Sequence, residues 1–246
     1  MRILAVDTAT SATVVGAVID GQFTEVEHVD ARGHASQIGI LLRAIVEATG
    51  NRDWDMIVCG VGPGPFTGLR VGIAACLGIA AVQGLPTIGV CTLDAIRRVA
   101  ATTHPRESIT VATRARRNEV YWARYDSVGH RTAGPIALPT DEARARADGL
   151  VVGDGAEMVA GSDPACDAQV VFPSAQALLM IVQERLDAGE VLPRLDAGAV
   201  GLDAPASVGA TTARALAQQA AAGRQLLPMR PLYLRRPDAV PTVDRS

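Results

Sequence analysis

The chain of 246 residues contains no lysine, so all 23 of its basic residues are arginine. This absence excludes every site that needs a lysine amine: the phosphate-binding lysine of a Walker-type loop, a Schiff-base lysine and a lysine general base. The cysteines are also few, and Cys59, Cys76, Cys91 and Cys166 show no close pairing. Three of them lie in apolar runs, so we expect reduced, buried thiols rather than disulfides or a zinc site.

Long apolar runs are missing as well. No uninterrupted apolar stretch reaches the roughly 18 residues that a membrane span needs, and residues 1–4 are expected to begin a buried strand rather than a signal peptide. Hydrophobic residues make up 48% of the chain and charged residues 20%, which is typical of a globular protein. The net charge of -3 gives no global attraction to nucleic acid. We expect a cytoplasmic protein with no membrane contact and no cofactor.

Hydrophobic periodicity and turn residues predict three strands followed by alternating helices and strands in the first half of the chain. The dipeptide Asp20-Gly21 predicts a hairpin turn between the second and third strands. The predicted strands cover residues 2–7, 12–19, 22–30, 56–61 and 87–90, and the predicted helices cover residues 35–49, 67–83 and about 93–104.

The same order partly recurs in the second half. Strands are predicted at 108–113, 119–125, 130–136 and 150–152, with helices at 141–147 and 174–188. Two such halves indicate an α/β fold of two lobes, the duplicated ribonuclease-H-like architecture of actin, Hsp70 and hexokinase. We expect an N-terminal lobe at 1–105, a smaller, degenerate lobe at 106–228 and a tail at 229–246. Residues 189–208 show no clear period and receive no assignment.

A glycine-rich stretch, GVGPGPFTGLRVG, occupies residues 60–72. A phosphate cradle needs several consecutive backbone N–H groups, but proline removes every second one from Gly62-Pro63-Gly64-Pro65. We therefore expect a tight turn, with Pro65 at or near the start of the following helix.

Small residues form a narrow stripe on that helix. Gly68, Gly72 and Cys76 are spaced i, i+4, i+8, and each glycine inside a helix costs about 1 kcal/mol relative to alanine. Another backbone must come close to offset this cost, either the protein's own sheet or a helix of a second subunit.

Five segments carry a family resemblance: ILAVDTAT (3–10), RGHA (32–35), GPGPFTGLR (62–70), NEVYW (118–122) and PLYLR (231–235). In this order they resemble the bacterial TsaB (YeaZ) family, most specifically over residues 1–125. The resemblance implies a two-lobed actin/Hsp70-type fold. It also implies pairing with the paralogue TsaD and the ATPase TsaE, which together place a threonylcarbamoyl group on the adenosine following the anticodon of certain tRNAs.

The chain departs from the family pattern at two positions. The family usually has serine where Pro65 stands, and an aspartate is common at the position of Arg114. No role tied to that aspartate is carried over to this chain.

TsaD-like catalytic paralogues carry H-x-E-x-H, whose two histidines share one helix face and hold a metal ion. In this chain Thr92 and Ile96 stand at the histidine positions, and Asp94 alone keeps a carboxylate. Isoleucine cannot bind a metal, so no metal site is expected. Asp94 is interpreted as a first-turn helix residue favoured by the helix dipole.

The nucleotide side of the superfamily is matched only in part. Asp7 lacks the glycine of the superfamily's D-x-G motif, so it is either a turn residue at a strand end or a metal–nucleotide contact. Gly153 and Gly155 flank an aspartate and form either a phosphate turn or an ordinary turn. Asp7, Gly153 and Gly155 are therefore the candidate nucleotide contacts.

The four histidines are scattered, and no nucleophile motif accompanies them, so no catalytic residue is expected. Arg114, Arg116, Arg117 and Arg124 form a basic cluster on a predicted hairpin, and the first three are the candidate tRNA contacts. The cluster either contacts tRNA phosphate or is a solvated face.

These patterns favour a non-catalytic subunit that supports TsaD in modifying tRNAs that read codons beginning with A. The alternative is an ATP-binding or ATP-hydrolysing enzyme of the actin/Hsp70 superfamily. The resemblance implies a partner surface on the helices 35–49 and 67–83, which in this family pack against the same pair of helices in TsaD. We expect the same surface to form a homodimer when TsaD is missing. Its residues are Ile38, Leu41, Leu42, Ile45, Phe66, Gly68, Leu69, Gly72, Ile73 and Cys76.

Overall fold

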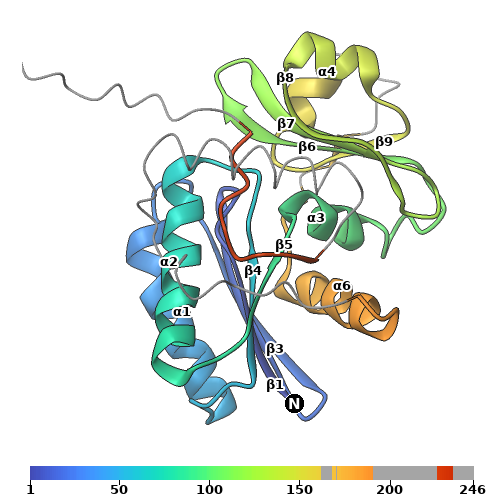
Figure 1. The fold of residues 1–246 in the computed structure, drawn as a ribbon. Helices are drawn as coiled ribbons and strands as arrows, with labels where there is room; N and C mark the ends of the chain where they lie inside the picture. The colour runs from blue at the N-terminus through green and yellow to red at the C-terminus, as the bar shows by residue number, and fades with distance from the viewer. Residues whose placement is uncertain (162–167, 170, 191–225, 235–246) are drawn as a thin grey trace, which may run out of the picture.

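A computed structural model of the chain describes residues 1–161, 168–169, 171–190 and 226–234 (Figure 1). Its first sheet has the strand order β11-β5-β4-β1-β2-β3. Strands β1 to β3 form an antiparallel meander, and β4 and β5 continue the sheet parallel to β1. The strands are β1 (Arg2–Asp7), β2 (Ala12–Ile19), β3 (Gln22–Val29), β4 (Met56–Gly60), β5 (Thr87–Val90) and β11 (Leu226–Leu227).

The second sheet repeats this arrangement, with the order β10-β9-β6-β7-β8. Again three antiparallel strands form a meander, and two further strands continue parallel to the first of them. The strands are β6 (Ile109–Arg116), β7 (Glu119–Tyr125), β8 (Arg131–Pro139), β9 (Leu150–Val152) and β10 (Ala168–Gln169). The repeated topology confirms the predicted duplicated α/β architecture.

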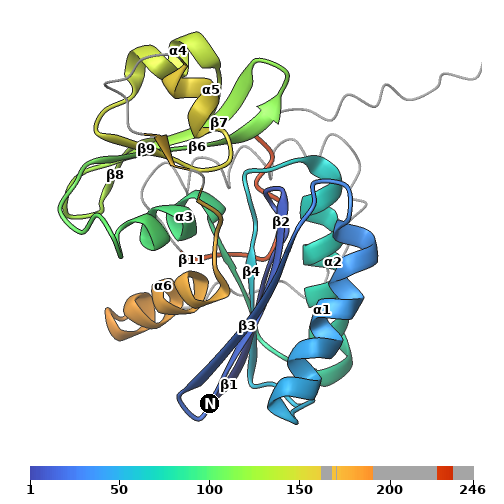
Figure 2. The same ribbon diagram turned by 180° about the vertical axis from the view of Figure 1, so that it is seen from behind.

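Helices separate and cover the two sheets (Figures 1 and 2). Helices α1 (His34–Thr49) and α2 (Phe66–Gln83) lie on one face of the first sheet, and α6 (Ala175–Asp187) lies on the other. Helix α3 (Thr92–Ala100) lies between the two sheets, while α4 (Thr140–Arg146) and α5 (Ala156–Ala160) cover the outer face of the second sheet.

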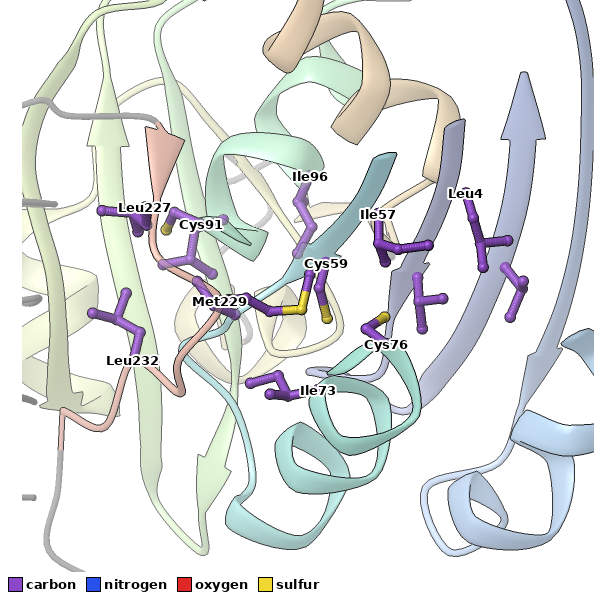
Figure 3. Close-up of a cluster of buried hydrophobic side chains, with 14 of the residues drawn as sticks. Leu4, Ile57, Cys59, Ile73, Cys76, Cys91, Ile96, Leu227, Met229 and Leu232 are labelled. Atoms are coloured by element: carbon purple, nitrogen blue, oxygen red, sulfur yellow. The ribbon is translucent and has the colours of Figure 1, made fainter. Parts of the chain in front are cut away.

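One apolar cluster runs through both sheets. It joins Leu4 and Ile57 of the first sheet to Val111 and Val152 of the second, with Ile96 of α3 among them. Figure 3 shows part of this cluster. Because the space between the sheets is filled in this way, the lobes share a core.

The predicted elements occur within a few residues of their expected bounds. The short elements α5, β10 and β11 were not predicted, because two to five residues are too few to show a period. The lobe boundaries stay a prediction: α6 and β11 fall in the range 106–228, but both pack on the first sheet. Residues 191–208 lie outside the described residues.

Cys59, Cys76 and Cys91 are free and buried, as expected, and Cys166 lies outside the described residues. A hydrogen bond with Cys76 and burial raise the pKa of Cys59, and burial raises the pKa of Cys91 to about 12. Cys59 and Cys91 therefore stay protonated, and all three described cysteines serve as core side chains.

The glycine stripe of α2 faces the protein's own first sheet. The Thr8 hydroxyl, just after β1, donates to the Gly68 carbonyl (2.7 Å) and accepts from the Gly72 N–H (3.1 Å). A Cβ on Gly68 would lie 2.5 Å from the Thr8 carbonyl oxygen, and a Cβ on Gly72 would lie still closer to the Thr8 side chain. The hypothesis that these glycines contact a second subunit is therefore wrong.

Gly72→Ala is expected to lower the free energy of unfolding by about 1–3 kcal/mol, because the added methyl group overlaps Thr8. Gly78→Ala is the matched control on the same helix. Gly78 is exposed and has no atom within 4 Å of an added Cβ, so alanine should raise stability by up to about 1 kcal/mol. Urea unfolding of both variants measures the difference, and equal stabilities would contradict the inward orientation of Gly72.

Candidate functional site

The motif around Asp7 and the turn at 153–155 lie close together, near the ends of β1 and β6. Asp7, the last residue of β1, is fully buried. One carboxylate oxygen accepts from the Ala9 N–H and the other from the Thr92 hydroxyl, both at 2.8 Å. Burial raises the pKa of Asp7 to about 6, although both hydrogen bonds lower it. Asp7 is thus a turn residue with both oxygens engaged inside the protein.

The turn Gly153-Asp154-Gly155 is bound internally in the same way. The Gly153 N–H donates to the Gln169 carbonyl and the Gly155 N–H to the Ala112 carbonyl, both at 3.0 Å. Neither N–H is therefore presented to a phosphate, and Asp7 offers no exposed oxygen. The three candidate nucleotide contacts are corrected accordingly.

Asp154 connects the two lobes. One of its oxygens accepts from the Ser11 hydroxyl (3.0 Å) and the Ser11 N–H (3.3 Å) in the β1–β2 loop, and the other accepts from the Arg114 N–H (2.9 Å). The two turns that would hold phosphates in a nucleotide-binding relative are thus bonded to each other.

The glycine-rich loop is a tight turn, as predicted. Gly62 exchanges two bonds with Thr92, from its N–H to the hydroxyl (3.2 Å) and from the Thr92 N–H to its carbonyl (2.8 Å). The Gly64 carbonyl accepts from the Tyr121 hydroxyl (3.3 Å), and a Cβ on Gly64 would overlap the Ala9 backbone. Pro65 is the N-cap of α2. The loop therefore connects β4 to α2, β7 and α3 and forms no phosphate cradle.

Asp94 lies in a buried charge pair that the sequence did not reveal. Its carboxylate accepts from Arg131 Nε (3.1 Å) and Nη2 (2.5 Å) and from the Tyr125 hydroxyl (2.6 Å). The side chains of Asp94 and Arg131 are each 2% exposed. Burial lowers the pKa of Arg131, but the charge of Asp94 more than offsets this and leaves the pKa above its usual value. The position of Asp94 between the apolar residues Leu93 and Ala95 in the first turn of α3 was the signal for a cationic partner.

The metal positions of the catalytic paralogues are occupied by internal contacts. Thr92 binds Asp7, Asp94 binds Arg131, and Ile96 is a fully buried core residue. Within the described residues, no group of three or more histidine, cysteine, aspartate or glutamate side chains lies together in a way that could hold a metal ion.

The predicted partner surface is largely internal. Phe66, Ile38 and Leu42 are partly buried, and the other seven residues are buried: Leu41, Ile45, Gly68, Leu69, Gly72, Ile73 and Cys76. The apolar side of each helix packs on the protein's own sheet, and the exposed side carries different residues. On α1 the exposed residues include Gly39, Ile40 and Arg43, and on α2 they include Thr67, Gly78 and Val82.

Helix α2 is apolar nearly all round, so its period did not reveal which side is buried. Its 18 residues have a mean hydropathy of 1.5, and 33% of them are buried, so the helix is long and apolar enough to cross a membrane. As the crossover between the parallel strands β4 and β5, however, it returns to the sheet at both ends. The crossover accounts for the helix without a membrane.

The arginine cluster lies on the β6–β7 hairpin. Arg114 is exposed, but its Nε donates to the Asp154 carbonyl (2.8 Å), so it supports the turn between the lobes. Arg116 and Arg117 are exposed near the hairpin turn, where Arg117 has a positive φ of 28°. Two of the three predicted tRNA contacts, Arg116 and Arg117, are therefore exposed near the same turn, and their contact with tRNA stays a prediction.

Comparison with known proteins identifies the family. The family model of TsaD, the tRNA N6-adenosine threonylcarbamoyltransferase, matches residues 26–151. The protein Rv3421c of Mycobacterium tuberculosis is 34% identical over 246 residues, covering 97% of this chain and 94% of that protein. TsaB of Escherichia coli is 38% identical over 127 residues, covering 51% of this chain and 55% of that protein. The chain belongs to the TsaB (YeaZ) family.

Solved structures agree with this assignment to the TsaB family. YeaZ from Pseudomonas aeruginosa superposes with a TM-score of 0.67 at 26% sequence identity, over 77% of this chain and 93% of that chain. The predicted resemblance and fold class are therefore confirmed. The match to E. coli TsaB, and that to the Mycobacterium leprae protein ML0378 (43% identical over 147 residues, 39% of its length), spans less than two thirds of the relative.

Asp7→Asn is expected to stabilise the protein at neutral pH. Because the pKa of Asp7 is about 6 when folded and 3.8 ordinarily, its ionisation costs stability as pH rises through this window. At pH 7.5 the free energy of unfolding of Asp7→Asn should be about 1–2 kcal/mol higher than that of the unmodified chain. This difference should shrink towards pH 4. Loss of the Thr92 hydroxyl's acceptor limits the gain. Urea unfolding across this pH range measures it, and a variant weakened at every pH would contradict the assigned role.

Proposed function

We propose that this chain is a non-catalytic subunit that supports a TsaD-type transferase in forming threonylcarbamoyladenosine. The modified base is the adenosine following the anticodon of tRNAs that read codons beginning with A. Membership of the TsaB family supports the pathway. One observation supports the non-catalytic role: internal bonds occupy the groups at the superfamily's metal and nucleotide positions.

A catalytic site needs side chains whose charges and hydrogen-bonding atoms are available to a substrate. Asp94 has its charge neutralised by Arg131, and Asp7 is held by Ala9 and Thr92. The bond from Ser11 to Asp154 joins the two turns that would have to separate around a nucleotide. We therefore expect the isolated chain neither to hydrolyse peptides nor to modify tRNA.

The proposed partner surface is the exposed side of α1 and α2. Gly39 and Gly78 are exposed helical glycines with no atom within 4 Å of an added Cβ. Unlike Gly68 and Gly72, they gain no close contact inside the chain for their cost of about 1 kcal/mol each. A backbone of the TsaD-type partner that approaches both glycines would offset that cost.

A stable interface buries about 1,600 Å² in total, so both helices are needed. The proposed assembly also includes the ATPase TsaE and is cytoplasmic. When the TsaD-type partner is missing, the same surface would pair two copies of this chain.

Gly78→Arg is expected to abolish binding to the TsaD-type paralogue of the same organism and to dissociate any homodimer. The unfolding temperature should stay unchanged, because the position is open in the monomer. Val128→Arg, which adds the same charge at a 72% exposed site in the β7–β8 turn, should bind normally. Sedimentation analysis gives the assembly state, and tRNA modification by the reconstituted complex gives the activity. If folded Gly78→Arg binds the TsaD-type paralogue normally, the partner surface does not include this side of α2.

The competing function, an ATP-binding enzyme, has a direct test. Micromolar binding of Mg–ATP to the isolated chain, measured by calorimetric titration, would favour that function and contradict the closed turns.

The hairpin arginines are proposed to contact tRNA phosphate within the complex. Arg117→Glu should weaken the affinity of the complex for tRNA and make its dependence on salt less steep, by about one unit of slope for each lost phosphate contact. Arg106→Glu, an exposed arginine in the α3–β6 connection, is the charge-matched control. Arg114 is left unchanged because it supports Asp154. Equal slopes for both variants would assign Arg117 to a solvated face.

A further inference from the structure

Three side chains form a stacked cluster at the start of α2. The rings of Phe66 and Tyr233 stack with centroids 5.1 Å apart, and the Arg70 guanidinium lies 3.8 Å from the centre of the Phe66 ring. Arg70 Nε donates to the Tyr233 hydroxyl at 3.2 Å. The cluster therefore fixes the direction of the Arg70 side chain.

Tyr233 reaches this position through the C-terminal segment. Strand β11 pairs with the edge strand β5, and the Leu232 N–H then donates to the Val61 carbonyl at 2.7 Å. Figure 1 shows the segment (red) running beside α2. Tyr233 thus contacts Arg70, 163 positions earlier in the sequence, and holds its guanidinium in place.

Arg70 differs from Arg131, Arg2 and Arg98 in its charge environment. Arg131, Arg2 and Arg98 each bind a carboxylate: that of Asp94, Asp55 and Glu184, respectively. Arg70 has no acidic partner among the described residues, and only its Nε is used. The Arg70 guanidinium is partly buried and already held in one direction. The N–H groups of its two terminal nitrogens remain available to donate hydrogen bonds.

The position of Arg70 adjoins the proposed partner surface. Ala74 and Gly78 follow it at i+4 and i+8, so the three residues lie along one side of the helix. Arg70 is the single charged residue of α2. A partner that covers the exposed side of this helix would therefore meet one fixed positive charge in otherwise apolar surroundings.

We propose that Arg70 is the charged anchor of this surface and binds an aspartate or glutamate side chain of the TsaD-type partner. Phe66 and Tyr233 act as positioning residues that hold its planar fork. A guanidinium binds a carboxylate through two parallel bonds, and prior orientation lowers the entropy cost of forming them. A lone cation suits a carboxylate better than a nucleic-acid backbone, whose phosphates are bound by several cations. This inference rests on the proposed function.

The test measures the dissociation constant for the TsaD-type paralogue by calorimetry at several salt concentrations, with the full chain. Arg70→Gln should weaken binding about 30- to 100-fold and make its salt dependence less steep. Arg70→Lys, which keeps the charge without the fork, should lie between. Tyr233→Phe keeps the ring stack and loses the hydrogen bond, so a loss of a few-fold is expected. Arg106→Gln, the charge-matched control, should bind within about twofold of the unmodified chain.

The outcomes separate the inference from the function on which it rests. If the unmodified chain binds the partner and Arg70→Gln binds equally well, the anchor is overturned and the proposed function stands. If Arg70→Gln lowers the unfolding temperature but leaves the partner affinity unchanged, Arg70 serves only to hold the C-terminal segment. This outcome overturns the anchor as well. If Arg70→Gln binds the partner normally but weakens the binding of tRNA, Arg70 binds phosphate rather than a carboxylate. This outcome also overturns the proposal. If the unmodified chain binds no partner, both the anchor and the proposed function fail.

Discussion

The bond between Asp94 and Arg131 determines how the two halves of the molecule sit against each other. Asp94 belongs to α3, which lies between the sheets, and Arg131 begins β8 of the second sheet. With both side chains 2% exposed, neither charge has water to solvate it, so each depends on the other and on the Tyr125 hydroxyl. Separating such a pair leaves an unpaired buried charge, which costs about 3–5 kcal/mol. The helix and the second sheet are therefore held in one arrangement.

Several features of the molecule depend on that arrangement. The Asp154 carboxylate reaches Ser11 of the first lobe, and the Tyr121 hydroxyl reaches Gly64, because the sheets approach closely. The same approach brings Val111 and Val152 into one core with residues of the first sheet. The two halves of the molecule are thus joined both by hydrogen bonds and by a shared apolar core.

Two kinds of glycine in α1 and α2 distinguish the inside of the protein from the proposed partner surface. Gly68 and Gly72 allow the close contact with Thr8, because a Cβ at either position would overlap that residue. Gly39 and Gly78 face open space, so the fold of the monomer does not require them. The orientation of Arg70 by two aromatic rings follows the same logic, because the monomer fixes a charge for which the described residues offer no carboxylate.

The sequence by itself determined the order of elements, the duplicated fold, the tight turn at Gly62 and the loss of the paired metal histidines. These features depend on local periodicity, on proline and on residue identity, all of which are read along the chain. The tertiary structure alone decided which side of α2 is buried, since a helix that is apolar nearly all round has no period to read. It also decided the partners of Asp94, Asp154 and Arg70. The bonds of Asp94 to Tyr125, of Asp154 to Ser11 and of Arg70 to Tyr233 join residues from 31 to 163 positions apart. Such pairings are set by the packing of distant elements rather than by local pattern.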